Sequence, residues 1–184
     1  KQIFMINYLV ILELTKSLSR SKIQISDFLT LRLGWWRPRF LIVDSNISVE
    51  KHDSEIELWI NSRGKNTRID YLHCQSEKLM EHFGSPNSNT NPLIIIYVKP
   101  GYVPLVTMDE FWISTTNAFL KNGLKLATIA YETNNRNEVV GYMLNNNDLL
   151  DVLNNDFTKF KQQLVTESVH HKHLSISSEY FAKI

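Results

Sequence analysis

The stretch from Thr107 to Asn146 constrains the fold most, because its local signals predict one capped helix followed by one β-hairpin. Thr107 and Glu110 have the spacing of a capping box, in which two side chains satisfy free backbone N–H groups at the start of a helix. Apolar residues then recur at helical spacing until Gly123, a residue type that commonly follows a helix end. From Leu124 the apolar period changes to two, which is typical of a strand.

The second half of this stretch predicts the turn and the returning strand of the hairpin. The polar run from Glu132 to Asn137 is typical of a turn, and the residues from Val139 to Leu144 are typical of a strand. Gly141 lies inside this returning strand. A glycine at such a position indicates a β-bulge or a close approach of another backbone.

The remaining elements are predicted from apolar runs and from the turn residues between them. Residues 2–20 predict a buried helix, since the apolar run from Ile3 to Leu12 is too short to span a membrane. Asp27–Leu33 fits either a short helix or a strand, and the polar tail Val165–Ile184 predicts no element. The predicted strands are Phe40–Val43, Ile47–Glu50, Glu55–Ile60, Arg68–Cys74 and Leu93–Val98, the last with a turn at Pro100–Gly101, and the further predicted helices are Gln75–Phe83 and Asp148–Leu164.

These elements predict an α/β or α+β domain with a mixed, largely antiparallel central sheet and helices packed on it. The length of 184 residues fits a single domain over 1–184, either complete or lacking a part. Within it we expect an N-terminal helical segment over 1–45. The strand, helix, helix and hairpin over 66–146 form the predicted core.

The charge balance and the cysteine count limit the classes of partner and compartment. With 20 basic and 19 acidic residues the net charge is +1, which gives no global attraction to nucleic acid or to an anionic membrane. We therefore expect neither partner. Cys74 is the only cysteine, so an intramolecular disulfide and a cysteine-rich zinc site are excluded. A reducing compartment fits this count, and we expect a soluble, cytoplasmic protein.

The spacing of the six glycines excludes the common phosphate-binding loops. No two glycines are closer than Gly84 and Gly101, so no Gly-x-Gly sequence exists. A P-loop and a dinucleotide-binding fingerprint both need such closely spaced glycines, because their backbones approach phosphate groups. A nucleophile-elbow serine, which lies between two glycines, is excluded for the same reason.

Three polar clusters suggest chemistry, and each also has a simpler interpretation. The His170–His173 cluster could bind a metal, but it lacks a nearby cysteine or a helical zinc motif, and a solvated segment explains it. The Trp35–Arg39 corner could stack on bases, but tryptophans packed under a turn, with arginines reaching outward, explain it better. Asp44, Glu55 and Glu57 resemble nuclease carboxylates, yet an exposed strand face accounts for them. We therefore predict no metal site.

Three segments carry a resemblance to a known family. They are KLMEHFGSPNSNTNPL (Lys78–Leu93), MDEFWISTTNAFLKNGLKLATIAYE (Met108–Glu132) and NEVVGYMLN (Asn137–Asn145). In this order they resemble the N-terminal half of the GNAT-type N-acetyltransferases, most closely the arylalkylamine N-acetyltransferase-like branch. The likeness covers less than half of the chain.

This resemblance implies an acyl-CoA-dependent N-acyltransferase-like domain, active or inactive, that acts on a small amine. Acetyl-CoA is the implied cofactor. The resemblance places Pro92, Leu93, Tyr131 and Tyr142 at the substrate-binding pocket. Asn91 stands where that branch commonly has its glutamate base, and an amide cannot accept the proton, so no catalytic residue is assigned.

The alternative hypothesis is a non-catalytic structural or protein-interaction subunit of a larger assembly. The near-neutral charge, the missing Gly-rich cofactor loop and the covered first helix are typical of such a subunit. Its partner would be another protein rather than a small amine.

Overall fold

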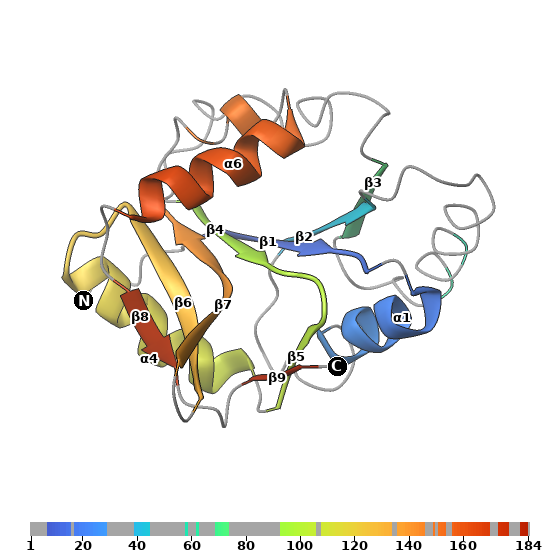
Figure 1. The fold of residues 1–184 in the computed structure, drawn as a ribbon, viewed down its shortest axis with the longest axis horizontal. Coiled ribbons are helices and arrows are strands. Elements are labelled where there is room, and N and C mark those ends of the chain that lie inside the picture. The colour runs from blue at the N-terminus through green and yellow to red at the C-terminus, as the bar shows by residue number, and fades with distance from the viewer. Residues whose placement is uncertain are drawn as a thin grey trace.

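The computed structural model describes residues 7–15, 17–28, 39–44, 58, 62, 69–73, 93–105, 108–133, 136–145, 149, 151–153, 156–169, 173–176 and 181–183. Within these residues a mixed sheet with helices on both faces dominates the fold (Figure 1). The elements in chain order are β1 (Asn7–Glu13), α1 (Leu18–Ser26), β2 (Arg39–Asp44), β3 (Ile69–His73), β4 (Leu93–Val98), β5 (Tyr102–Pro104), α4 (Met108–Lys121), β6 (Leu126–Thr133), β7 (Arg136–Leu144), α6 (Phe157–Ser168), β8 (His173–Ile176) and β9 (Phe181–Lys183).

The main sheet has the strand order β3-β2-β1-β4-β7-β6-β8, and β5 pairs with β9 in a second, two-stranded sheet. Strand β1 pairs in parallel with β2 and with β4, and β2 pairs in parallel with β3. Strand β7 is antiparallel to both β4 and β6, and β8 is parallel to β6. The chain therefore leaves β1 toward β2 on one side, and later returns to add β4 on the other side.

The predicted helix over residues 2–20 is wrong, and so is the N-terminal helical segment over 1–45. Residues Asn7–Glu13 form strand β1, and α1 begins only at Leu18, after the cap residue Ser17. An apolar run without alternation is compatible with a buried helix and equally with a strand that is covered on both faces. Strand β1 is of the second kind, since it lies in the middle of the sheet between β2 and β4.

The prediction of a mixed α/β sheet is confirmed, but its largely antiparallel character is wrong. Four of the six strand pairs in the main sheet are parallel: β1–β2, β1–β4, β2–β3 and β6–β8. The predicted strand directions depended on the hairpin, which is the one antiparallel unit with a short connection. Parallel pairs join distant segments, so no local turn signal reveals them.

Several local predictions are confirmed, and others lie outside the described residues. Helix α4, the hairpin β6–β7, strands β2, β3 and β4 and the turn at Pro100–Gly101 are present as expected. The predicted helix Asp148–Leu164 is interrupted: Leu149 and Asp151–Leu153 are helical, and α6 begins at Phe157 after the cap Asp156. The tail contains the unpredicted β8 and β9. Thr107, Ile47–Glu50, Gln75–Phe83 and Glu55–Ile60 are outside the described part, except for Leu58, which is helical.

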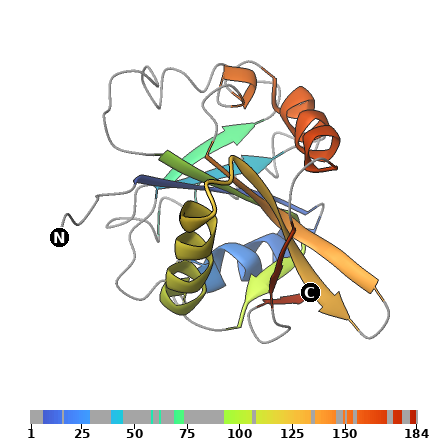
Figure 2. The ribbon, with the colours of Figure 1, turned by 90° about the vertical axis from the view of Figure 1, so that its left-hand side faces the viewer.

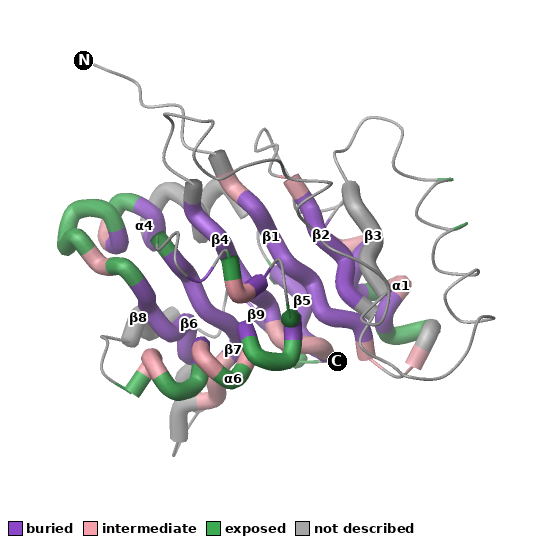
Figure 3. Tube along the Cα trace, turned by 90° about the horizontal axis from the view of Figure 1, so that it is seen from above, coloured by how far each residue is buried: buried purple, intermediate pink, exposed green. Residues whose placement is uncertain are grey.

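The sheet separates two hydrophobic cores. Figure 2 shows α6 on one face of the sheet and α1 with α4 on the other. The core under α1 and α4 is built from Val10, Leu12, Phe28, Phe40, Ile94, Ile96, Val98, Tyr102, Phe119, Ala127, Ile129, Val140, Met143 and Phe181. The core under α6 is built from Leu9, Ile11, Leu41, Val43, Ile95, Tyr97, Leu126, Tyr142, Leu144, Leu149, Leu153, Phe157, Phe160 and Leu164. The central strands are buried along most of their length as a result (Figure 3).

Strand β7 has a bulge next to Gly141, as the sequence predicts. Ile129 pairs with Gly141 and Ala130 pairs with Val139, so Val140 is the extra residue. The close approach is present as well, because a Cβ atom on Gly141 would lie 2.0 Å from the carbonyl oxygen of Tyr97. The extra residue changes which face each later side chain of β7 occupies.

We expect Gly141→Ala to lower the free energy of unfolding by about 3 kcal/mol, because the Tyr97 carbonyl belongs to a central strand and cannot move aside. Gly123→Ala is the matched control. Gly123 has a φ of +63° but open space around its Cβ position, so its backbone strain costs only about 1 kcal/mol. Urea unfolding of both variants measures this difference. Equal losses would contradict the backbone clash.

Candidate functional site

The strand order places a topological switch point between β1 and β4. The connection after β1 leads through α1 to β2, whereas the connection after β4 leads away from β1 toward β5 and α4. In open α/β sheets such diverging connections leave a crevice at the carboxyl ends of the two strands, and ligands bind there. Glu13 to Thr15 and Ser17 after β1, with Lys99 to Gly101 after β4, form this switch edge, and it is our candidate site.

Hydroxyl groups shape the connection from β1 to α1. The Thr15 hydroxyl accepts a hydrogen bond from the Ser17 N–H (3.2 Å) and donates one to the Ser17 carbonyl (2.9 Å). The Ser17 hydroxyl accepts from the Arg20 N–H at 3.4 Å, which caps the helix. The first turn of α1 has no acidic residue. The partial positive charge at the start of α1 is therefore not neutralised from within the helix, which favours an anionic ligand.

Lys99 is the first residue after β4 and is half-buried. Its N–H donates to the Val140 carbonyl (2.8 Å), and its carbonyl accepts from the side-chain amide of Gln24 on α1 (3.3 Å). Burial lowers the pKa of the Lys99 ammonium, and the negative charge of Glu138 acts in the opposite direction. Within the described part of the chain the ammonium has no hydrogen-bond or ion-pair partner.

Glu13, the last residue of β1, is a buried carboxylate with 6% of its surface exposed. One carboxylate oxygen accepts a hydrogen bond from the Tyr97 hydroxyl, and the other pairs with the Lys161 ammonium at 3.0 Å. Lys161 also lies 5.2 Å from the ring centre of Phe157. Burial, and then the charge of Glu13, raise the pKa of Tyr97, so this phenol stays a hydrogen-bond donor. The cluster joins β1, β4 and α6.

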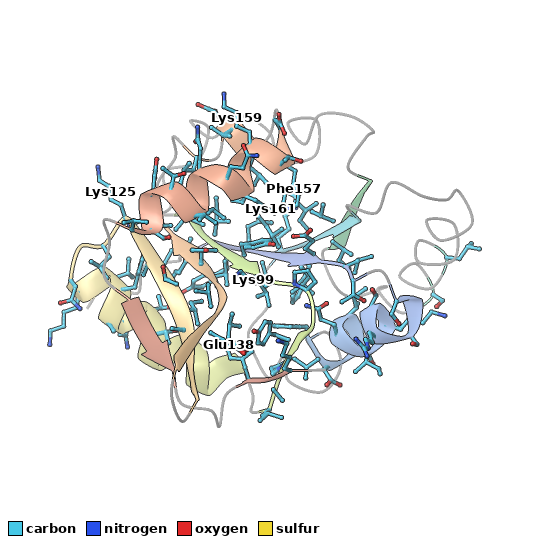
Figure 4. The ribbon with its side chains drawn as sticks, in the orientation of Figure 1. Lys99, Lys125, Glu138, Phe157, Lys159 and Lys161 are labelled. Carbon is cyan, nitrogen blue, oxygen red and sulfur yellow. The ribbon has the colours of Figure 1, made fainter. Side chains whose placement is uncertain are left out.

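A second charged cluster lies on the opposite face of the sheet. The Tyr102 hydroxyl donates to Glu138 at 3.0 Å, and the Lys183 ammonium lies 3.8 Å from the same carboxylate oxygen. These contacts connect β7 with β5 and β9. In the view of Figure 4, Lys99 lies between Glu138 and the pair of Lys161 and Phe157. Among the described residues, Lys161 and Lys183 are paired with carboxylates, whereas the Lys99 ammonium is open to an incoming anion.

The structure describes three of the four predicted substrate-binding residues, and it places Leu93 away from Tyr142. Leu93 is the first residue of β4, at the amino end, and lies four residues before Tyr97, about 13 Å along the strand. Tyr142 is buried in β7 opposite Tyr97, and Tyr131 belongs to β6. Pro92 lies outside the described residues. That these positions line a substrate site stays a prediction, as do the expected partners and compartment.

The structure describes only a few residues of the other sequence clusters. His173 belongs to β8 and Arg39 begins β2, while His170, His171, Glu55 and Glu57 lie outside the described residues. Asp44 ends β2. Among the described residues no three His, Cys, Asp or Glu side chains are placed to share a metal ion. None of the described helices is both long and apolar enough to cross a bilayer.

Sequence reasoning missed Glu13, Tyr97 and Lys99. A usable signal exists, because Glu13 and Lys99 each come directly after an apolar run. If both runs are assigned as parallel strands, these charged residues fall at the same carboxyl edge. Assigning the first run to a helix removed that signal.

The fold and the switch edge together define a doubly wound, Rossmann-like α/β domain. Neither the family models nor the curated protein sequences gave a match to this chain. Solved structures do match. The mannosyltransferase PcManGT from Pyrobaculum calidifontis, in complex with GDP-Man and Mn2+, superimposes with a TM-score of 0.60 at 8% identity, over 97% of this chain and 59% of that one. TarS 1-349 from S. aureus, in complex with UDP, gives a TM-score of 0.52 at 9% identity, over 97% and 60%.

The chain thus shares the fold of these two structures and spans about three-fifths of their length. The resemblance to GNAT-type N-acetyltransferases is wrong, and with it the N-acyltransferase function and the acetyl-CoA cofactor. The two structures bind GDP-Man with Mn2+ and UDP. The helix and hairpin that suggested the resemblance are real, but they occur beside a parallel β3-β2-β1-β4 unit. Local order of elements did not distinguish the two folds.

We expect Lys161→Met to lower the free energy of unfolding by about 2 kcal/mol, because Glu13 stays buried with one partner fewer. Lys159→Met is the matched control, since Lys159 is exposed on the same helix. It should change the free energy of unfolding by less than about 0.5 kcal/mol. Urea unfolding measures both values. A double-mutant cycle with Glu13→Gln should show coupling, and additive effects would contradict the buried pair.

We expect Tyr97→Phe to lower the free energy of unfolding by about 2 kcal/mol at neutral pH, because Glu13 loses a hydrogen-bond donor. The raised pKa of Tyr97 also predicts a pH effect. Its stabilising contribution is complete below the unfolded pKa near 10 and is lost as the pH rises above that value. The free energy of unfolding, measured from pH 8 to 11, should therefore fall less steeply with pH for Tyr97→Phe than for wild type. Parallel curves would contradict this.

Proposed function

We propose that the chain is a nucleotide-sugar-binding domain of the glycosyltransferase type. The observation that carries this proposal is the switch point between β1 and β4 in the order β3-β2-β1-β4-β7. The superposition on PcManGT and TarS, over 97% of this chain in each case, supports the same assignment. In the proposal, the nucleoside diphosphate lies across the carboxyl ends of these strands.

The chemistry of the switch edge fits a diphosphate. A nucleotide sugar carries its negative charge on the diphosphate, which links the nucleoside to the transferred sugar. The positive end of α1, whose first turn has no acidic residue, and the half-buried ammonium of Lys99 come from the two diverging connections, and both favour an anion. The Gln24 side chain fixes the backbone of Lys99 to α1, so the two features keep a constant relation to one another.

The proposed reaction is the transfer of a sugar to an acceptor hydroxyl. The acceptor oxygen forms a bond to the anomeric carbon and gives up its proton to water. The bond from that carbon to the phosphate oxygen breaks, and the nucleoside diphosphate leaves with the electron pair. Negative charge therefore grows on the leaving phosphate as the bond breaks. Fixed positive groups at the switch edge stabilise this charge more in the transition state than in the ground state, which is how they accelerate transfer.

We expect UDP or GDP to raise the melting temperature of the chain by about 4 °C at a concentration ten times the dissociation constant. Hydrogen exchange should slow at Leu14–Thr15 and at Lys99–Gly101, because these backbones lie at the switch edge. Acetyl-CoA is the control ligand and should protect neither segment. If neither nucleotide changes the melting temperature or the exchange, the proposed function is wrong.

A further inference from the structure

Binding of a nucleoside diphosphate requires a positive counter-charge, and in the PcManGT structure a divalent cation, Mn2+, accompanies GDP-Man. Divalent cations of this kind bind mainly to carboxylate oxygens. The described carboxylates at and near the switch edge of this chain, Glu13 and Asp44, can therefore be tested for their fit to such a cation.

Glu13 does not fit the role of a metal ligand. It ends β1, at the centre of the switch edge, but both of its carboxylate oxygens already have partners, the Tyr97 hydroxyl and the Lys161 ammonium. To reach a cation Glu13 would have to leave Lys161 as an unpaired, partly buried charge, which is costly. Asp44 ends β2, two strands from β4, so about 10 Å separates its backbone from the end of β4.

The residue at the end of β4 has the opposite charge from a metal ligand. Lys99 would repel a divalent cation, and its ammonium makes no ion pair among the described residues. Glu138 offsets the positive charge of Lys99 only at long range, because its carboxylate is held by Tyr102 and Lys183. A half-buried ammonium of this kind has lost part of its hydration, and an anion that reaches it restores the lost interactions.

We propose that this chain binds the diphosphate of its nucleotide ligand without a divalent cation, with the Lys99 ammonium supplying the counter-charge. This inference rests on the proposed nucleotide-sugar function and specifies how its site works. The ammonium lies at the carboxyl end of β4, on the connection that diverges from α1. Lys99 and the start of α1 then contact the diphosphate from the two sides of the switch point.

The test is calorimetric titration of the whole chain with UDP and with GDP, first in EDTA and then in MnCl2. We expect the dissociation constant in EDTA to lie within about threefold of its value with Mn2+. Lys99→Met should weaken diphosphate binding about 30-fold in EDTA, the size expected for one charge-assisted contact. Lys99→Arg should retain most of the affinity, and Mn2+ should not rescue Lys99→Met.

Two controls separate a binding effect from a folding effect. Lys159→Met removes an exposed lysine of α6 and should leave both dissociation constants unchanged. Lys99→Met should keep or raise the melting temperature, because burial disfavours the charged ammonium in the free protein. A folded Lys99→Met variant that binds UDP and GDP as well as wild type would overturn the inference.

The outcomes also distinguish this inference from the proposed function. Nucleotide binding that appears only with Mn2+ would overturn the role of Lys99 and leave the nucleotide-binding function standing. No binding of UDP or GDP under either condition would overturn both. Binding in EDTA that depends on Lys99 supports both.

Discussion

The buried carboxylate of Glu13 organises the centre of this structure. It is the last residue of the middle strand, and its two oxygens are held by Tyr97 from β4 and by Lys161 from α6. A buried charge is tolerated only when its partners are fixed, so this carboxylate determines how α6 sits on the sheet. The same contacts occupy the carboxylate of Glu13 at the centre of the switch edge. The groups of this edge that can meet an anion are then positive, namely the Lys99 ammonium and the start of α1. The structural and the functional interpretations of the site therefore depend on one cluster.

Local features of the fold could be predicted from the sequence, but the arrangement of the sheet could not. Helix α4, the hairpin and the bulge at Gly141 follow from cap, turn and glycine signals within a few residues of each other. Strand β1 was assigned to a helix because its apolar run has no period, and β8 and β9 lie in a tail with little apolar pattern. Which strands become neighbours depends on packing between distant segments, and no local signal records it.

The candidate site was harder to predict than the fold, for a related physical reason. Glu13 and Lys99 are 86 residues apart in the numbering (99 − 13), and only the parallel pairing of β1 with β4 brings their strand ends to one edge. The four residues chosen from the family resemblance came instead from a hairpin and a loop. That resemblance used the order of elements along the chain, which two unrelated sheets can share. Strand order and direction distinguish them, and these are properties of the folded molecule.

The extra residue in β7 has a consequence that reaches the far end of the chain. Val140 and Met143 face the same core although they are three positions apart, and Glu138 consequently lies on the face where Tyr102 and Lys183 meet it. If β7 alternated regularly through Val140, with no bulge, Glu138 would turn toward α6. Lys183 of β9 would then lose its carboxylate partner, and Lys99 would lose the opposing charge that Glu138 supplies. One irregular backbone position in β7 thereby determines both the ion pair with Lys183 of β9 and the charge that acts on Lys99 at the switch edge.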